Sequence, residues 1–189
     1  MEVKKENVLA AYETAREAGA DSTMKVLEAL FGKDTFKPQD VTERVKTFED
    51  ACRELDIEAD KWLQDRAELG FEPDVIAYMK LRIICAALNE GWKPKFTEDE
   101  WRYYPWFWLY TQDEINDMDE QEKQDRHLIP TGDYGTGYAG FAFASSYYAP
   151  SHTATSVGSR LCLKSEALAV YCGKQFIDIW ADFNLVRRR

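Results

Sequence analysis

The chain has 189 residues, of which 45% are hydrophobic and 31% are charged, values close to those of ordinary globular proteins. This composition argues against a disordered chain, and the length suits one domain, or one domain with a small helical appendage. The formal net charge of -10 disfavours non-specific adhesion to nucleic acid or to an anionic membrane.

The location of the protein is predicted from its N-terminus and its apolar runs. The first six residues lack the apolar stretch of a secretory signal, and no apolar run is long enough to cross a bilayer. We therefore expect a cytoplasmic protein without a membrane partner. The four cysteines are widely spaced within apolar patterns, so we expect reduced core residues and no disulfide. They are Cys52, Cys85, Cys162 and Cys172.

The first part of the chain predicts a helical segment over residues 1–39, followed by a main domain over 40–189. Within the segment, Ser22 suits the N-cap of a second helix, and Gly32 suits its C-terminal end. Asp40 and Glu43 resemble a capping box. Apolar residues then recur at spacings of four and three, which predicts a single amphipathic helix from 41 to 55.

Two further helices are expected before the pattern changes. The first is a short piece around Trp62 that Gly70 closes. The second begins near Pro73 and is apolar almost all the way round until Gly91 ends it, which is typical of a central, buried helix.

Three strands are then expected, over 101–110, 141–148 and 153–164. The first is dense in aromatic residues, and Pro105 within it implies an edge position or a bulge. The acidic stretch between the first two strands is expected to be a short solvent-facing helix or excursion. Ser165 caps a final helix that runs to about Phe183.

The predicted fold class is therefore α+β. A helical N-terminal part packs with a small antiparallel sheet of about three strands, and the C-terminal helix covers that sheet.

No catalytic, cofactor-binding or metal-binding residue is predicted. His127 and His152 both lie in expected loops without a nucleophile in a recognisable context. The acidic stretch does not follow the spacing of a calcium-binding loop, and the glycines between 132 and 140 lack the Gly-Lys-Ser/Thr that a phosphate-binding loop requires. We expect a protein that is not an enzyme and has no cofactor.

A binding surface is predicted on the sheet. Alternation along 158–164 sends Leu161 and Leu163 to one face and the cationic residues to the other, beside aromatic residues of the neighbouring strands. Such a face suits a protein interface or a single-stranded nucleic acid, and the acidic composition favours the protein interface. The expected contact residues are Arg160, Lys164, Tyr103, Trp106 and Tyr147.

Five segments together resemble a known family. They are VTERVKTFEDAC (41–52), ALNEGWKP (87–94), YYPWF (103–107), GSRL (158–161) and YCGKQF (171–176). The match covers about 40 to 183 and is similar to a family of uncharacterised proteins encoded by gut Bacteroidetes-type bacteria, their phages and mobile elements. The resemblance implies a small phage-associated protein that acts in the bacterial cytosol or is packed into a virion, and it carries no catalytic residue with it.

The function expected from the sequence is a non-enzymatic macromolecule-binding or accessory protein of phage or mobile-element origin. Its expected partner is a protein or a second copy of itself. A single-stranded nucleic-acid-binding protein and a virion structural component are the alternatives.

Overall fold

The computed structural model describes residues 3–95, 97, 99–149 and 159–188. It divides the chain into two compact units, Met1–Arg44 and Val45–Arg189. The first unit contains α1 (Lys5–Glu17), α2 (Asp21–Phe31), the 3-10 turn η1 (Lys33–Phe36) and α3 (Val41–Arg44).

The first unit is built around Tyr12 of α1. The Tyr12 ring stacks on Phe36 with 4.1 Å between ring centroids, and its hydroxyl donates a 2.7 Å hydrogen bond to Glu28 Oε1 of α2. The prediction that Ser22 is an N-cap is wrong, because α2 begins one residue earlier and makes no side-chain cap hydrogen bond. Gly32 ends α2 as predicted, with a φ of 82° that glycine adopts without strain.

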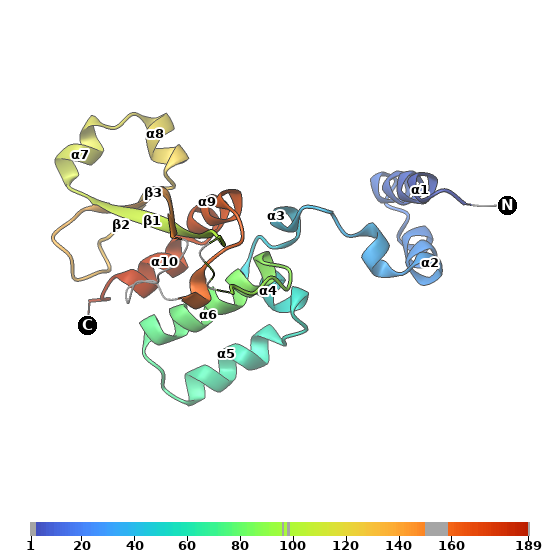
Figure 1. Cartoon of the computed structure of the whole chain (residues 1–189), viewed down its shortest axis with the longest axis horizontal. Helices are drawn as coiled ribbons and strands as arrows, with labels where there is room; N and C mark the ends of the chain where they lie inside the picture. The colour runs from blue at the N-terminus through green and yellow to red at the C-terminus, as the bar shows by residue number, and fades with distance from the viewer. Residues whose placement is uncertain (1–2, 96, 98, 150–158, 189) are drawn as a thin grey trace. The chain divides into compact units, whose positions relative to one another are not determined.

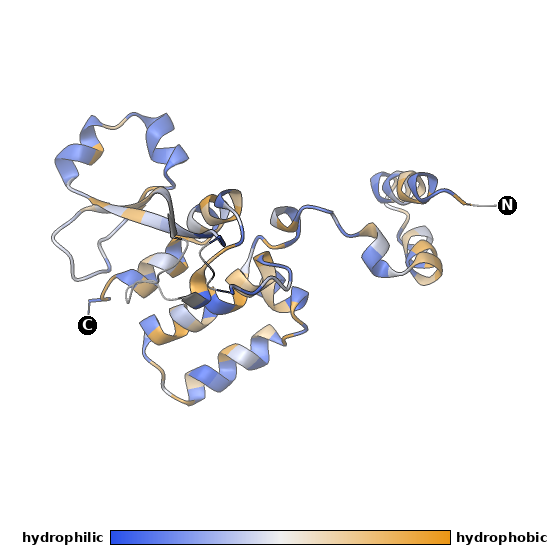
Figure 2. Ribbon diagram, in the orientation of Figure 1, coloured by the Kyte–Doolittle hydropathy of each residue, from blue (hydrophilic) through white to orange (hydrophobic). Residues whose placement is uncertain are grey.

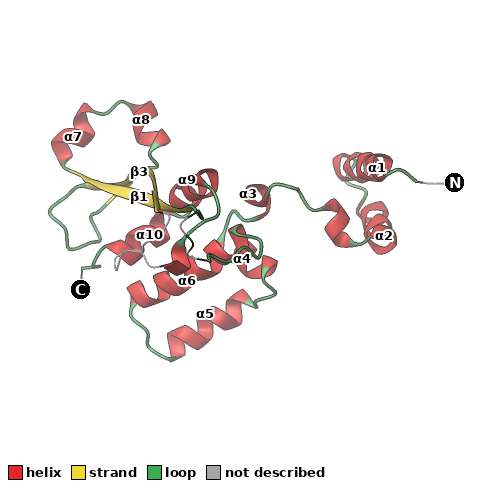
Figure 3. Ribbon diagram, viewed as in Figure 1, coloured by secondary structure: helices red, strands yellow, loops and turns green. Residues whose placement is uncertain are grey.

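In the second unit, helices come before, between and after the strands along the chain (Figure 1, Figure 3). Its helices are α4 (Phe48–Glu54), α5 (Ala59–Glu68), α6 (Pro73–Leu88), α7 (Gln112–Asp117), α8 (Glu120–Asp125), the 3-10 turn η2 (Ser159–Leu161), α9 (Glu166–Gln175) and α10 (Ile177–Asn184). Its strands are β1 (Arg102–Tyr110), β2 (Ile129–Pro130) and β3 (Gly140–Ala149).

The single helix predicted over 41–55 is two helices, α3 and α4. Thr47 begins α4 with a capping box, in which its hydroxyl accepts from the Asp50 N–H at 3.1 Å and Asp50 Oδ2 accepts from the Thr47 N–H at 3.0 Å. Thr47 itself has extended backbone angles, so the helix cannot run through it. The capping box lies at this position and not at Asp40 and Glu43.

The sheet is antiparallel, with strand order β1-β3-β2. The strands predicted over 101–110 and 141–148 are confirmed as β1 and β3. Trp106 pairs with Ser145 while Phe107 pairs with Phe143, so Ala144 is an extra residue that forms a bulge on β3. Side chains along β1 therefore alternate between the two faces of the sheet without interruption.

The third predicted strand, over 153–164, is wrong in its described part. Ser159–Leu161 is the 3-10 turn η2, and Leu163 makes only an isolated bridge to Tyr103; residues 150–158 lie outside the described part of the chain. Asn89, just after α6, explains this: its side-chain amide donates to Cys162 O at 2.8 Å and its oxygen accepts from Lys164 N at 2.9 Å. The Asn89 side chain thus binds the backbone on either side of Leu163, and the third strand of the sheet is the two-residue β2.

The final helix is capped by Ser165 as predicted, with its hydroxyl accepting from the Leu168 N–H at 3.3 Å. It is interrupted at Phe176, whose φ of -114° is not helical, so α9 and α10 replace one helix. Both helices pack on one face of the sheet, which confirms the predicted cover, and α10 packs in turn on α6 (Figure 1).

The core lies between the sheet, the two C-terminal helices and α6. Its fully buried side chains include Leu81, Ile84 and Leu88 of α6 and Leu161 and Leu163 near η2. All four cysteines are buried and free, as predicted. Within the described ranges, none of the helices combines the length and the apolar character that crossing a membrane requires.

Candidate macromolecule-binding face

The two predicted cationic contacts do not lie on the sheet. Arg160 is exposed on η2, which packs on α6. Lys164 Nζ forms a 2.7 Å ion pair with Glu90 Oε2 in the loop after α6. Because the alternation expected over 158–164 is absent, these cations and the aromatic strand are not brought together on one sheet face.

The three predicted aromatic contacts do not all lie on the same face of the sheet. Tyr103 and Trp106 are three residues apart on β1, so their side chains point to opposite faces of the sheet. Tyr103 is half-buried, whereas Trp106 is 47% exposed. Tyr147 lies on β3 and pairs with Tyr104. Its side chain lies outside the described part of the structure, so its role as a contact residue stays a prediction.

An exposed aromatic pair defines what we call the outer face, the side of the sheet turned away from α9 and α10. Phe107 points towards those helices, where its ring lies 4.8 Å from that of Phe141 and 5.4 Å from that of Trp180. Trp106 and Trp108 flank Phe107 and therefore point to the outer face. Trp108 is 53% exposed, and sequence reasoning missed it although it stands two residues from Trp106.

Small residues of β3 lie opposite both tryptophans. Trp108 pairs with Ala142 and Trp106 pairs with Ser145. Since cross-strand neighbours on one face are the closest side-chain contacts in a sheet, these short side chains cover little of either indole ring. The outer face therefore presents two large aromatic surfaces to solvent.

An acidic segment, residues 112–126, includes α7, which lies over the outer face, and α8, which ends at the edge of β3 away from β1, where Arg126 O accepts from the Phe143 N–H at 2.9 Å. A Cβ atom on Gly140 would lie 2.7 Å from the ends of the Ile115 and Leu128 side chains, so α7 and the loop after α8 cover this end of β3. Gly140 and Ala142 are two residues apart and share the outer face. Figure 1 shows α7 and α8 on the side of the strands opposite α10, and Figure 2 shows both as predominantly hydrophilic.

The acidic segment carries seven Asp and Glu residues against two Lys and Arg residues. Both cations are already paired inside the segment: Lys123 with Glu120 at 2.8 Å and Arg126 with Glu122 at 2.9 Å. The pKa of Glu114 lies below its ordinary value because the Thr111 backbone N–H, and then the Thr111 hydroxyl, donate to its carboxylate. The segment is therefore strongly anionic at neutral pH.

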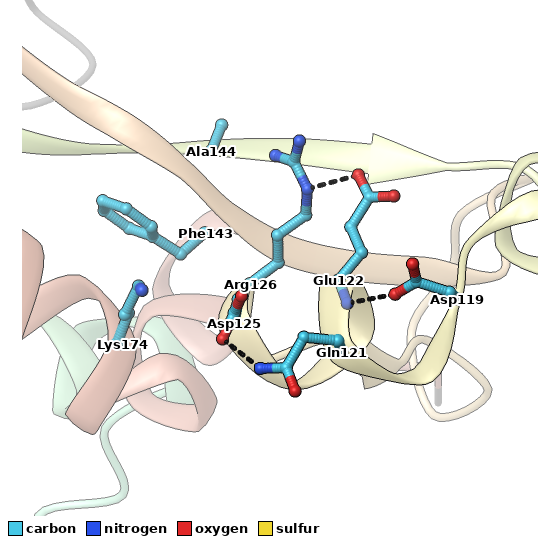
Figure 4. A pocket seen from close by; sticks show the side chains of 8 residues that line it. All are labelled: Asp119, Gln121, Glu122, Asp125, Arg126, Phe143, Ala144 and Lys174. Carbon is cyan, nitrogen blue, oxygen red and sulfur yellow. Dashed lines mark hydrogen bonds and ion pairs between the residues drawn. The ribbon is translucent and has the colours of Figure 1, made fainter.

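A shallow hollow of about 450 Å³ lies between α8, β3 and α9 (Figure 4). Its walls carry Asp119, Gln121, Glu122, Asp125, Arg126, Phe143, Ala144 and Lys174. Most of its polar groups are engaged with one another: Asp119 Oδ1 accepts from the Glu122 N–H at 2.7 Å, and Gln121 Nε2 donates to Asp125 at 2.9 Å. The hollow continues the acidic surface past the edge of the sheet.

The described residues contain no group of three His, Cys, Asp or Glu side chains placed to hold a metal ion. His127 is exposed in the turn after α8, and His152 lies outside the described ranges. Comparison with protein-family models, with curated proteins and with solved structures found no match. The outer face, with the acidic segment beside it, is therefore the candidate binding surface.

Proposed function

We propose that this chain is a non-enzymatic protein-binding or accessory protein that contacts its partner through the outer face. The observation that carries the proposal is the pair Trp106 and Trp108, 47% and 53% exposed and two residues apart on one strand. Tryptophan buries more apolar area than any other side chain and is enriched among the residues that dominate protein interfaces. Two such rings on a small sheet make a compact interaction surface.

A protein partner fits this surface better than a nucleic acid does. Binding to a phosphate backbone relies on Lys and Arg side chains that neutralise phosphates. Arg160 and Lys164 lie away from the outer face, and the neighbouring acidic segment has an excess of five negative charges. Single-stranded nucleic acid therefore remains the second candidate, supported by the aromatic rings alone.

An association with phages or mobile elements is part of the proposal and rests on the family resemblance over 40–183. On this proposal the protein acts in the bacterial cytosol, where its partner is a host or phage protein. A structural role in the virion is the third candidate, and it predicts that the protein sediments with purified particles.

The test is an affinity pull-down from a bacterial host lysate with tagged wild-type protein, with and without nuclease. The key variant is the double change Trp106→Ala and Trp108→Ala. The matched control is Trp101→Ala, which removes an indole that is 48% exposed just before β1. Circular dichroism establishes that each variant is folded.

We expect a protein that survives nuclease treatment, is retained by Trp101→Ala, and is reduced at least tenfold by the double variant. Recovery of nucleic acid in place of protein would assign the face to the second candidate. Equal capture by the wild type and the folded double variant would overturn the assignment of the outer face as the binding surface.

A further inference from the structure

The edge of β1 that faces away from β3 pairs with no described residue along its second half. At its start, Tyr103 exchanges two backbone hydrogen bonds with Leu163, of 3.1 and 2.9 Å. Alternate residues of a strand present their N–H and C=O groups to the same edge, so Pro105, Phe107 and Leu109 face the same way as Tyr103. No described residue hydrogen-bonds the backbone N–H or C=O of Phe107 or Leu109.

An open strand edge is a template for another extended chain. A segment that paired with Phe107 and Leu109 would lie next to β1, and every second side chain would project onto the outer face. There it would meet Trp106 and Trp108 at the distance of cross-strand neighbours, about 4.5–5.5 Å between Cβ atoms. The edge and the tryptophans therefore form one continuous surface for an extended ligand.

The charge of the surroundings selects the side chains of that ligand. α7 follows β1 directly after Thr111, and its six residues include Asp113, Glu114 and Asp117 but no Lys or Arg. A Lys or Arg on the added strand would be attracted both by these carboxylates and by the faces of the indole rings. An acidic side chain in the same place would be repelled.

We infer that the partner binds as an extended segment with Lys or Arg at alternate positions, added as a fourth strand to the open edge of β1. This inference rests on the proposed function, whose partner it specifies. A second copy of the chain fits less well, because β1 has no Lys or Arg from Tyr103 to Tyr110 and each copy carries a net charge of -10.

The probe is a fluorescein-labelled ten-residue peptide of alternating Lys and Thr, with binding to the full chain followed by fluorescence anisotropy. A peptide with Glu in place of every Lys is the charge control. Two further peptides carry N-methyl groups, one on all Lys residues and the other on all Thr residues. N-methylation removes N–H donors from one edge of the strand only, since alternate residues face opposite edges.

We expect the Lys–Thr peptide to bind at least tenfold more tightly than the Glu–Thr peptide. One of the two N-methylated peptides should lose at least tenfold in affinity, while the other keeps most of it. The double change Trp106→Ala and Trp108→Ala should weaken binding at least tenfold, and Trp101→Ala should not.

Equal affinities of the two N-methylated peptides would overturn strand addition, because non-specific charge attraction does not distinguish the two edges. Failure of the Lys–Thr peptide to bind, or equal binding of the Glu–Thr peptide, would overturn the basic segment as ligand. A nuclease-resistant partner lost in the tryptophan double variant would then leave the proposed function standing without this inference. Concentration-dependent dimerisation in sedimentation, lost in the same variant, would assign the edge to a second copy.

Discussion

The hydroxyl of Tyr134 donates a 2.7 Å hydrogen bond to Oδ1 of Asp182, the same oxygen that Arg187 Nη2 approaches to 2.6 Å. Tyr134 lies in the loop between β2 and β3, and Asp182 lies on α10. Backbone hydrogen bonds from Gly135 N to Val186 O at 2.7 Å and from Arg188 N to Asp133 O at 2.9 Å hold the same segments together. The basic C-terminal segment is therefore anchored to the loop that precedes β3.

This bond predicts a pH dependence of stability. Burial, and then the hydrogen bond to Asp182, raise the pKa of Tyr134 well above its ordinary value. The neutral phenol therefore stabilises the native state fully below the unfolded pKa of about 10, and this contribution is lost as the pH rises towards the folded pKa. Tyr134→Phe should lower the free energy of unfolding by about 1.5–3 kcal/mol at pH 7, with a smaller difference above pH 10.

Urea unfolding at pH 7 and at several values from pH 9 to 11 measures this difference. Tyr138→Phe is the control, since Tyr138 is an exposed tyrosine of the same loop. A constant difference between wild type and Tyr134→Phe over the whole pH range would contradict the prediction.

We expect truncation of the Asn89 side chain to cause a large loss of stability. Its buried side chain satisfies Cys162 O and Lys164 N, two backbone groups more than seventy positions away in the sequence. Asn89→Ala leaves both without this partner, at a cost of about 1–3 kcal/mol for each buried group. Glu90→Gln, which removes the partly exposed ion pair with Lys164, should cost less than about 1 kcal/mol in the same denaturant titration. Similar costs for the two variants would contradict the role given to Asn89.

Gly173 predicts a steric limit between α9 and the sheet. A Cβ atom there would lie 2.6 Å from Phe143 Cδ2 and 2.7 Å from Pro105 Cβ. Gly173→Ala should therefore destabilise the fold by about 1–3 kcal/mol through overpacking, even though alanine favours helices. Gly132→Ala is the matched control because its Cβ would meet nothing within 4 Å. Thermal unfolding compares the two, and an unchanged or higher melting temperature for Gly173→Ala would refute the close packing.

The cysteines predict an unreactive native chain. Burial raises the pKa of Cys162 to about 11 in spite of the nearby Arg102 guanidinium, and a hydrogen bond with Cys172, together with burial, raises the pKa of Cys85. Thiolate is the reactive form, so Ellman's reagent at pH 8 should modify no thiol rapidly in the native protein. It should modify all four after denaturation. Rapid modification of a native thiol would show that at least one of these sites is accessible.

Local patterns were sufficient to predict the elements whose signals are contained within them. α6 has its proline in the first turn and an almost continuous apolar surface, and β1 has an aromatic density that helices seldom show. The break at Thr47 was also readable, because a threonine three residues before Asp50 is a capping signal. The continuous apolar periodicity through 41–55 concealed it.

The third strand could not be predicted in the same way. Alternating leucines at Leu161 and Leu163 are typical of a strand, yet both are buried around a turn that Asn89 fixes from a distant part of the chain. This error misplaced Arg160 and Lys164 and with them the basic character expected of the face. Trp108 could have been predicted from the sequence, because the two-residue period of a strand places it on the same face as Trp106.

The open stretch of β1 is short, because Leu163 pairs with Tyr103 at one end and Thr111 begins the turn into α7 at the other. Pro105 has no N–H, so only Phe107 and Leu109 offer both backbone groups to an added chain. A linear ligand held over so few residues has a small interface and dissociates quickly. Residence times long enough for a lasting complex would then require several such contacts made together, either by repeated copies of the ligand segment or by an assembly that displays this chain more than once.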